Sequence, residues 1–420
     1  MNEGLRKPVV VIGGGIAGLT AAVELADAGC AVILVEKSPS LGGQVARLHQ
    51  YFPKLCPPTC GIEMHLRRIR DNDAITVHTN AEVTEVSGTR GDYRVTVRLG
   101  PDYVSQACTA CGECMAACPV DRPDSFNYGL SKTKAVFLPG GIPYPVRYTI
   151  DRKFCPAECN ACEKACRYGA VNLSAAADWR KYHVSALIAA TGWQPYDAAR
   201  IEYLGFGRCA NVVSNVMVER MAAADGPTAG VIQRPSDGRP PRSVAFVQCA
   251  GSRDENHLPY CSSVCCTASI KQISYLRAQQ PETAITVFYI DLRTPGRLEE
   301  FRSRVLFGAN VRLVKGKVAR VEEIPESGNV AVTAEDVLSG PKQTSEFELV
   351  VLATGMAPRT EGLPPVFEPD EYGFLASGDG DGLLSAGCVH RPGEVSSSVR
   401  NATAAALKAY QASKRSERHA

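Results

Sequence analysis

The chain has 420 residues, of which 45% are hydrophobic and 21% charged, as in an ordinary globular protein. Its length predicts about two to three domains. Lys and Arg number 46 against 44 Asp and Glu, which leaves a net charge of only +2. Because no charge excess attracts nucleic acid or anionic lipid, both are excluded as general partners.

Seventeen cysteines are the unusual part of the composition. The chain opens directly into an apolar strand, "PVVVIGGG", which predicts that no secretory leader is present. No apolar run reaches the length of about 18 residues that spans a bilayer, so we expect a cytoplasmic protein without direct membrane insertion. In a reducing cytoplasm, this many cysteines indicates metal or redox chemistry rather than structural disulfides.

The first predicted elements form a nucleotide-binding unit. An apolar strand over residues 9–12 leads into Gly13, Gly15 and Gly18, the pattern G-x-G-x-x-G, and a helix follows over residues 19–28. The first glycine allows a tight turn, the second lets a pyrophosphate approach the backbone, and the third allows the helix to pack closely on the strand.

An acidic residue completes this pattern. Glu36 ends the next strand, 18 residues after Gly18, where a carboxylate binds the adenosine ribose and disfavours a 2′-phosphate. A second glycine pair follows in "SLGGQ" (residues 40–44) and is suited to lie against a cofactor. A glycine turn alone is weak evidence, but strand, helix, second strand and acid together predict a dinucleotide site.

Cys56 and Cys60 stand close together in "LCPPTCG". The spacing C-x3-C can bring two sulfurs together, so a redox dithiol near the cofactor is one interpretation. A loop that the prolines simply hold in shape is the other.

Residues 101–175 contain two cysteine runs typical of ferredoxins. The first, "CTACGECMAACPV", matches C-x2-C-x2-C-x3-C-P, whereas "CPAECNACEKAC" has one residue more in its first gap. In two-cluster ferredoxins the fourth cysteine of each run binds the other cluster. The expected ligand sets are therefore Cys108, Cys111, Cys114 and Cys166 for one [4Fe–4S] cluster, and Cys155, Cys159, Cys162 and Cys118 for the other. Structural zinc is the alternative, which four-cysteine runs with a trailing proline disfavour.

Two apolar segments end in Ala-Thr-Gly, and "DGLLSAGCVHRPGEVSSSVRN" leads into a helix near the C-terminus. These segments resemble those of two-dinucleotide-domain flavoprotein disulfide reductases, which implies FAD at the first site and a helix N-terminus directed at the flavin. That family has Asp where this chain has Cys388, so the resemblance does not extend to the carboxylate that contacts the ribityl chain. The implied FAD contacts are Gly13, Gly15, Ile16, Ala17, Gly18, Glu36, Lys37, Gly42, Gly43, Gln44, Val83, Thr191, Gly192, Gly387, Cys388 and Val395.

A second dinucleotide-type domain should begin with the strand at residues 243–248. The turn after it lacks G-x-G-x-x-G and instead carries four cysteines, which are Cys249, Cys261, Cys265 and Cys266. Four thiolates at a strand end and a helix start can hold a third [4Fe–4S] cluster. Buried packing of the Cys-Cys pair, or a dithiol formed by two of the four, are the alternatives.

"YFPKLCPPTCG", "QCAGSRDENHLPYCSSVCC" and "FYIDLRTPGR", together with the ferredoxin runs, resemble the A subunit of heterodisulfide reductase. They resemble the A subunit of the quinone-interacting membrane-bound oxidoreductase more closely still. The resemblance implies FAD beside a cluster that replaces the nicotinamide site, and transfer of single electrons. It also implies electron exchange between quinone and adenylylsulfate reductase in dissimilatory sulfur metabolism. The implied partners are a membrane cytochrome b-type subunit and a sister flavoprotein/iron–sulfur subunit. These partners would hold the chain at the inner face of the membrane. A homodimer is a further alternative.

The expected fold class is α/β, with two disulfide-reductase-like dinucleotide-binding domains of three-layer ββα type and an inserted ferredoxin-like 2[4Fe–4S] domain. We expect the FAD domain at 1–100, 176–235 and 345–420, the insert at 101–175 and the second domain at 236–344. One rival function is a heterodisulfide-reductase-like subunit that acts in sulfur transfer without quinone. Another is an NAD(P)H-dependent flavoprotein reductase, which the missing second fingerprint disfavours, and a third is an electron carrier without a substrate of its own.

Overall fold

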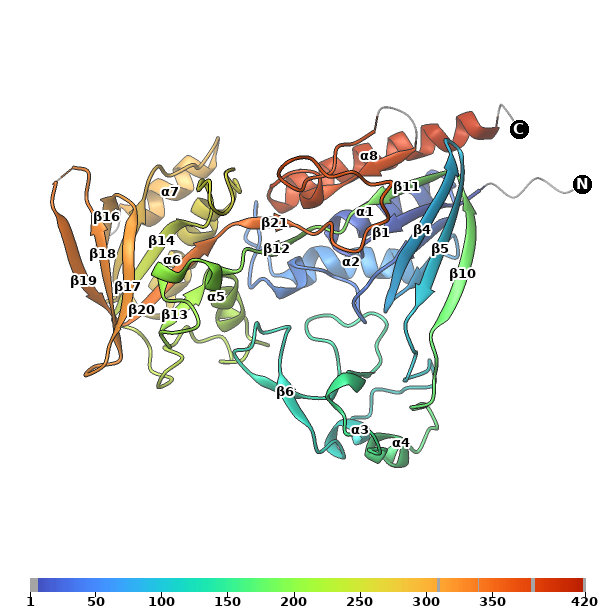
Figure 1. Ribbon diagram of the computed structural model, residues 1–420, viewed down its shortest axis with the longest axis horizontal. Helices are drawn as coiled ribbons and strands as arrows, with labels where there is room; N and C mark the ends of the chain where they lie inside the picture. The colour runs from blue at the N-terminus through green and yellow to red at the C-terminus, as the bar shows by residue number, and fades with distance from the viewer. Residues whose placement is uncertain (1–6, 308–309, 339, 379–381, 418–420) are drawn as a thin grey trace, which may run out of the picture. The chain divides into compact units, whose positions relative to one another are not determined.

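The computed structural model describes residues 7–307, 310–338, 340–378 and 382–417 (Figure 1). The chain forms two compact units, which are Met1–Trp193 together with Pro358–Ala420, and Gln194–Ala357. Strands β12 (Trp193–Pro195) and β21 (Met356–Pro358) pair with each other where the chain passes between the units. Within the described ranges, no helix is both long enough and apolar enough to cross a bilayer.

The first unit is built on a five-stranded sheet whose strands all run parallel. In spatial order they are β22 (Leu383–Ser385), β11 (Ala186–Ala189), β1 (Val9–Ile12), β2 (Val32–Val35) and β3 (Ile75–His78). Every residue of β1 and β2 is buried. Both faces of the sheet are covered, which explains why these strands are continuous apolar runs in the sequence.

Helices cover one face of this sheet and a second, antiparallel sheet covers the other. The helices are α1 (Ile16–Asp27), α2 (Pro58–Arg70) and α8 (Val395–Glu417), and the strands of the second sheet are β4 (Ala81–Thr89), β5 (Asp92–Leu99) and β10 (Asp178–Val184). Val9 and Val11 pack toward the helices, whereas Val10 and Ile12 pack toward the antiparallel sheet. Successive strand residues point to opposite faces, so β1 contributes to both cores. This is the three-layer ββα architecture that the sequence predicts.

Between β5 and β10 the chain forms an insertion of short elements (cyan to green in Figure 1). They are α3 (Glu113–Ala116), α4 (Ala161–Ala165), β6 (Asp121–Pro123), β7 (Lys132–Lys134), β8 (Val136–Phe137) and β9 (Thr149–Ile150). A β-bridge joins Val104 to Val171. The small core of the insertion includes Cys114, Cys118 and Cys162, so thiols take positions that aliphatic side chains would fill in an ordinary core.

The second unit repeats the three-layer plan. Its parallel sheet has the order β13 (Val212–Ser214), β20 (Leu349–Thr354), β14 (Ser243–Ala250), β15 (Ala284–Tyr289) and β16 (Val311–Lys315). Its other elements are the helices α5 (Asn215–Ala222), α6 (Cys265–Gln279) and α7 (Leu298–Leu306) and the antiparallel strands β17 (Val318–Ile324), β18 (Asn329–Glu335) and β19 (Lys342–Phe347). In this unit β14 and α6 hold the places that β1 and α1 hold in the first.

The boundaries of the second unit differ from those predicted at residues 235/236 and 344/345. β13 pairs with β20, and β20 pairs with β14, so both strands belong to the second parallel sheet. The sequence places them in the FAD domain because β20, like β11, ends at an Ala-Thr-Gly turn. Parallel pairing between segments this far apart in the chain leaves no local signal that would correct this assignment.

Candidate functional site

The first candidate site is the glycine turn between β1 and α1. Gly13 has a φ of +110°, and a side chain there would collide with the carbonyl oxygen of Ala190. A side chain at Gly18 would collide with the carbonyl oxygen of Gly13. Gly15 precedes α1, and no side chain caps this helix. The backbone N–H groups from Ile16 onward can therefore receive a phosphate, as a dinucleotide requires.

Glu36 follows β2 directly and is fixed to the glycine turn. Its Oε2 accepts a hydrogen bond from the Gly14 N–H at 2.5 Å, and its Oε1 accepts one from the Ser38 N–H at 2.7 Å. The residue is buried. Each carboxylate oxygen can accept a further hydrogen bond, so this carboxylate remains able to bind ribose hydroxyls.

The second glycine pair packs backbone to backbone against the first turn. Gly42 forms a β-bridge with Gly15, and a side chain at Gly43 would lie 2.8 Å from the Cα atom of Gly15. Gln44, which follows, is engaged by the protein itself. Its Nε2 donates to the Trp193 carbonyl oxygen at 3.3 Å, and its Oε1 accepts from the Tyr128 hydroxyl at 2.8 Å.

Lys37 and Val83, two further predicted FAD contacts, also have protein partners. The Nζ of Lys37 lies 3.4 Å from the Glu82 carboxylate, and the lysine side chain is exposed. Val83 is buried in the core between the two sheets. Its side chain is therefore not free for a ligand, and only its backbone could meet one.

Thr191 and Gly192 form the turn after β11. The Thr191 hydroxyl donates to the carbonyl oxygen of Arg359 at 2.5 Å, and the Arg359 N–H donates to the Gly192 carbonyl oxygen at 3.0 Å. Gly192 has a φ of +72°, which favours glycine. The turn is thus hydrogen-bonded to Arg359, next to Pro358, where the chain returns to the first unit.

The C-terminal motif places Gly387 against the start of α1. A side chain at Gly387 would lie 2.7 Å from the Cβ of Ala17, and its N–H donates to the Asn401 Oδ1 at 2.7 Å. Asn401 is a site residue that the sequence reasoning missed, although a lone amide in an alanine-rich helix was the available signal. α8 itself begins at Val395, the last predicted contact.

Cys388 stands where the flavoprotein motif has a carboxylate, and its thiol has partners within the protein. Its thiol donates to the Gly393 carbonyl oxygen at 3.4 Å and lies 3.6 Å from the Ser398 hydroxyl. Burial raises the pKa of this thiol, so it is neutral at physiological pH. It fastens the loop between the short helix Gly387–Val389 and α8.

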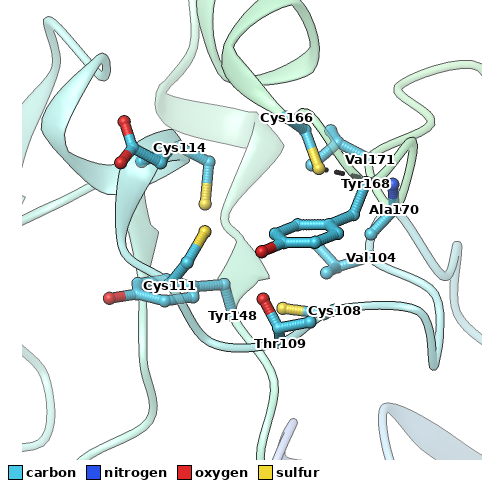
Figure 2. A pocket seen from close by; sticks show the side chains of 11 residues that line it. Val104, Cys108, Thr109, Cys111, Cys114, Tyr148, Cys166, Tyr168, Ala170 and Val171 are labelled. Carbon is cyan, nitrogen blue, oxygen red and sulfur yellow. Dashed lines mark hydrogen bonds between the residues drawn. The ribbon is translucent and has the colours of Figure 1, made fainter.

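The first predicted set of cluster ligands lines one pocket in the insertion (Figure 2). Cys108, Cys111 and Cys114 reach it from one run and Cys166 from the other. The Cys108 sulfur accepts a hydrogen bond from the Ala110 N–H at 3.4 Å, and the Cys166 sulfur accepts one from the Ala170 N–H at 3.3 Å. Backbone N–H groups directed at cysteine sulfurs are one means by which proteins tune iron–sulfur clusters. Two aromatic lining residues, Tyr148 and Tyr168, were missed by the sequence reasoning.

Charge within this pocket favours a cation. Burial, followed by the negative charges of Cys108 and Cys111, raises the pKa of the Cys114 thiol to about 11. Thiolates this close repel one another, so they can ionise together only around positive charge such as that of iron.

The second set gathers Cys118 of the first run with the second run. Burial raises the pKa of both Cys155 and Cys162, and Cys118 is among the neighbouring thiols that raise it further. The Arg152 guanidinium holds the loop, because its Nη1 donates to the Cys159 carbonyl oxygen at 2.8 Å. Cys118 of the first run therefore lies among thiols of the second run.

The third set lies in the second unit at the end of β14 and the start of α6. A register shift between Val247 and Ala250 interrupts the pairing of β14, and Cys249 within it has a φ of +55°. Burial, followed by the charge of Cys266, raises the pKa of Cys249 to about 11. Cys265 is buried, and Cys266, Cys249 and Cys261 add to the rise of its pKa. The four thiols are thus mutual neighbours where the first unit has its glycine turn.

Two arginines and an aspartate border the third set and were not singled out by the sequence reasoning. The Asp291 carboxylate receives the Arg253 Nη1 on one oxygen and the Arg293 Nε on the other, the latter at 3.3 Å. Arg293 also lies close to Cys261, whose negative charge raises the pKa of the guanidinium. In the described part of the chain, no group of three or more Cys, His, Asp or Glu side chains is arranged to hold a metal ion. In this structure the cysteines of each set are free thiols that lie near one another.

Residues 8–58, which contain β1, the glycine turn and Glu36, match the family model described as FAD dependent oxidoreductase. The chain is 36% identical over 420 residues to the A subunit of the H(2):CoB-CoM heterodisulfide,ferredoxin reductase of Methanothermobacter marburgensis, with 95% of this chain and 63% of that protein covered. It is 37% identical over 416 residues to the second iron-sulfur A subunit of the CoB–CoM heterodisulfide reductase of Methanopyrus kandleri, with the same coverage. The chain therefore spans less than two thirds of the length of these relatives.

Solved structures show the fold. Thioredoxin reductase of T. acidophilum has a TM-score of 0.53 at 14% identity, and the match covers 96% of this chain and 98% of that one. Thioredoxin reductase of Lactococcus lactis has a TM-score of 0.54 at 14% identity, with 98% and 100% covered. At this identity the likeness establishes a dinucleotide-binding flavoprotein fold and nothing more. The chain is thus similar over 95% of its length to the A subunit of heterodisulfide reductase, and the comparisons support an oxidoreductase subunit whose cofactors are FAD and iron–sulfur clusters.

Proposed function

We propose that this chain is an electron-transfer subunit in which FAD at the glycine turns of the first unit exchanges electrons with [4Fe–4S] clusters at the three cysteine sets. The observation that carries the proposal is the pocket that Cys108, Cys111 and Cys114 share with Cys166. The fourth thiol comes from the other cysteine run, which is the ligand arrangement of two-cluster ferredoxins. The insertion is accordingly proposed to be a ferredoxin-like domain.

The insertion is fastened directly to the glycine-rich loop at residues 40–47. The Tyr144 N–H donates to the Ser40 hydroxyl at 2.9 Å, and the Tyr128 hydroxyl donates to Gln44 at 2.8 Å. The Arg47 guanidinium lies 5.2 Å from the centre of the Tyr128 ring. These contacts support electron transfer between the insertion and FAD, because a fixed donor–acceptor geometry is what such transfer requires.

In the second unit the cysteine set takes the place of a phosphate-binding turn. Cys249 lies at the end of β14 and Cys265 begins α6, and no G-x-G-x-x-G turn joins this strand and helix, which disfavours NAD(P)H as the electron donor. FAD, when bound, supplies storage for two electrons and can release them singly to one-electron carriers. The protein's own part is to hold the cofactors, exclude water from Cys114 and Cys265, and place Arg293 beside Cys261.

We further infer that electrons pass between a membrane quinone-reactive partner and adenylylsulfate reductase in dissimilatory sulfur metabolism. A cytochrome b-type subunit together with a sister flavoprotein/iron–sulfur subunit would then hold the chain at the inner face of the membrane. The support is the sequence resemblance to the quinone-interacting oxidoreductase. The relatives at 36% and 37% identity favour a second candidate, a heterodisulfide-reductase-like subunit that works without quinone.

Iron, acid-labile sulfide and FAD content of anaerobically purified protein test the cofactor proposal. We expect about twelve iron atoms per FAD, four for each of three clusters. Cys166→Ser should remove about four of them, whereas Cys30→Ser, at a buried packing position in the first unit, should remove none. Zinc with little iron, or an unchanged iron content in the Cys166 variant, would contradict the proposal.

The cellular role is tested by isolating the tagged chain from its own host. Co-purification with a cytochrome-bearing membrane protein is expected for the quinone role. Its absence, together with a sulfur-transfer enzyme among the partners, would support the second candidate. Rapid reduction of the flavin by NADH would contradict both.

A further inference from the structure

Two thiols outside the three cysteine sets lie together at the start of α2. Cys56 precedes the helix and Cys60 lies in its first turn, close enough to Cys56 to raise the pKa of the Cys56 thiol. Both are free thiols, and Cys60 is exposed while Cys56 is half-buried. The proposed electron-transfer function uses neither of them.

The backbone holds this pair in a fixed place. Cys56 forms a β-bridge with Tyr51, whose N–H donates to the Cys56 carbonyl oxygen at 3.0 Å. The Cys60 N–H donates to the Pro57 carbonyl oxygen at 3.1 Å. The helix that carries Cys60 is anchored in the core by Ile62, which is fully buried. Both thiols therefore stand on a well-supported segment of backbone.

Tyr51 lies beside the pair. A side chain at Gly61, the residue after Cys60, would lie 2.5 Å from the Tyr51 hydroxyl, so glycine makes room for the ring. Burial raises the pKa of Tyr51, and the charges of Cys60 and Cys56 raise it further. Both thiols are thus close to this hydroxyl, and solvent retains access to Cys60.

We propose that Cys56 and Cys60 are a redox-active dithiol that undergoes exchange with an external disulfide. The Cys60 thiolate attacks one sulfur of a disulfide RS–SR′, which forms a mixed disulfide on Cys60 and releases R′S⁻. The Cys56 thiol loses its proton and attacks the Cys60 sulfur, which forms the Cys56–Cys60 disulfide and releases RS⁻. The dithiol is oxidised by two electrons, the external disulfide is reduced to two thiols, and the reverse reaction restores the dithiol.

The assignment of the two roles follows from their surroundings. Cys60 is the more exposed thiol and lies in the first turn of a helix, where free backbone N–H groups stabilise negative charge. The pKa of Cys56 is raised by desolvation and then by the neighbouring Cys60, so Cys56 is the thiol that keeps its proton. Cys60 is the attacking thiol and Cys56 the resolving one.

The chain offers a direct readout, because trypsin releases both thiols in one peptide, residues 55–67. The anaerobic holoprotein is equilibrated in glutathione buffers of rising potential and then alkylated. We expect this peptide to carry either two alkyl groups or none, and the unalkylated form to be lighter by two hydrogen atoms. Cys56→Ser should trap a glutathione adduct on Cys60, and Cys60→Ser should slow the reaction with oxidised glutathione at least about tenfold.

Cys30→Ser is the control and should leave the two-state pattern of this peptide unchanged. Independent alkylation of the two thiols at every potential would overturn the proposal. So would a loss of iron in Cys56→Ser, because that would make the pair cluster ligands. The proposal does not rest on the clusters, and the peptide readout stands even if the iron content disproves them.

Discussion

The hydroxyl of Tyr128, in the cysteine-bearing insertion, donates a 2.8 Å hydrogen bond to the side-chain oxygen of Gln44, which directly follows the second glycine pair. The other end of the Gln44 amide donates to the Trp193 carbonyl oxygen at 3.3 Å. One side chain thus links the insertion, the proposed flavin loop and the end of the turn after β11.

Tyr128→Phe should lower the free energy of unfolding of the first unit by about 1 kcal/mol, because it removes the hydrogen bond to Gln44. Combined with Gln44→Ala, the double variant should lose less than the sum of the single losses, since both remove the same bond. Urea denaturation monitored by flavin fluorescence gives the free energy of unfolding of the parent, the two single variants and the double variant. Strict additivity would show that the bond does not contribute in solution.

Gly18→Ala should weaken retention of FAD at least tenfold, or about 1.4 kcal/mol, because a methyl group there collides with the Gly13 carbonyl oxygen and displaces the turn. Gly207→Ala is the control, because its φ of +77° adds backbone strain where no atom lies within 4 Å of the added carbon. It should leave the flavin content unchanged. FAD per chain after gel filtration measures both, and equal flavin loss in the two variants would contradict the role given to the turn.

Lys271→Met should destabilise the second unit by about 3–5 kcal/mol, since it leaves the buried Glu219 charge without its cation. The Lys271 Nζ and the Glu219 carboxylate are 3.1 Å apart, and their side chains are only 4% and 3% exposed. Removing both charges in Glu219→Leu/Lys271→Met should recover most of the loss. Arg67→Ala, which breaks an exposed pair with Glu63, should change the urea midpoint very little.

Stability of the first unit should fall as the pH drops through about 6.5. Burial lowers the pKa of both His65 and His78, with Arg68 and Arg180 respectively adding to the shift. The unfolded chain therefore takes up protons at a higher pH than the folded chain, and its protonation draws the equilibrium toward unfolding. Urea midpoints at several pH values should show a shallower slope in His65→Gln/His78→Gln than in the parent. An equal slope would assign the acid sensitivity to other groups.

Arg293→Ala should shift the reduction potential of the proposed third cluster to a more negative value, because a positive charge beside Cys261 favours the reduced form. A loss of about 1 kcal/mol corresponds to on the order of 40 mV for one electron. Arg297→Ala, at an exposed position nearby, is the matched control. Redox titration followed by electron paramagnetic resonance measures the shift, and equal potentials in the two variants would exclude a role for the Arg293 charge.

Those features of the candidate sites that depend on short motifs can be predicted from the sequence. Gly13, Gly18 and Glu36 stand at fixed spacings because a single turn must meet a phosphate and a ribose, and the ferredoxin pattern pairs Cys166 with the first run. Neither inference needs the three-dimensional fold. Both rest on chemistry that constrains neighbouring residues.

What the sequence does not predict depends on contacts between distant segments. The hydrogen bond from Tyr128 to Gln44, the Asn401 side chain at Gly387, and Asp291 between its two arginines each join parts of the chain that only the fold brings together. The sequence analysis placed β13 and β20 in the FAD domain, whereas both strands belong to the parallel sheet of the second unit. The error has the same cause, because the sequence of a single strand does not show which strands lie beside it in a parallel sheet.

The left-handed backbone of Cys249 has an evolutionary consequence. A side chain at a φ of +55° costs about 1 kcal/mol relative to glycine, so Cys249→Gly would make the metal-free polypeptide more stable. A mutation of Cys249 to glycine is therefore favoured by the stability of the polypeptide, and only selection for the cysteine sulfur can oppose it. A lineage that lost its need for the third cluster should drift to glycine here, and the turn would then come to look like the nucleotide-binding turn of the other unit.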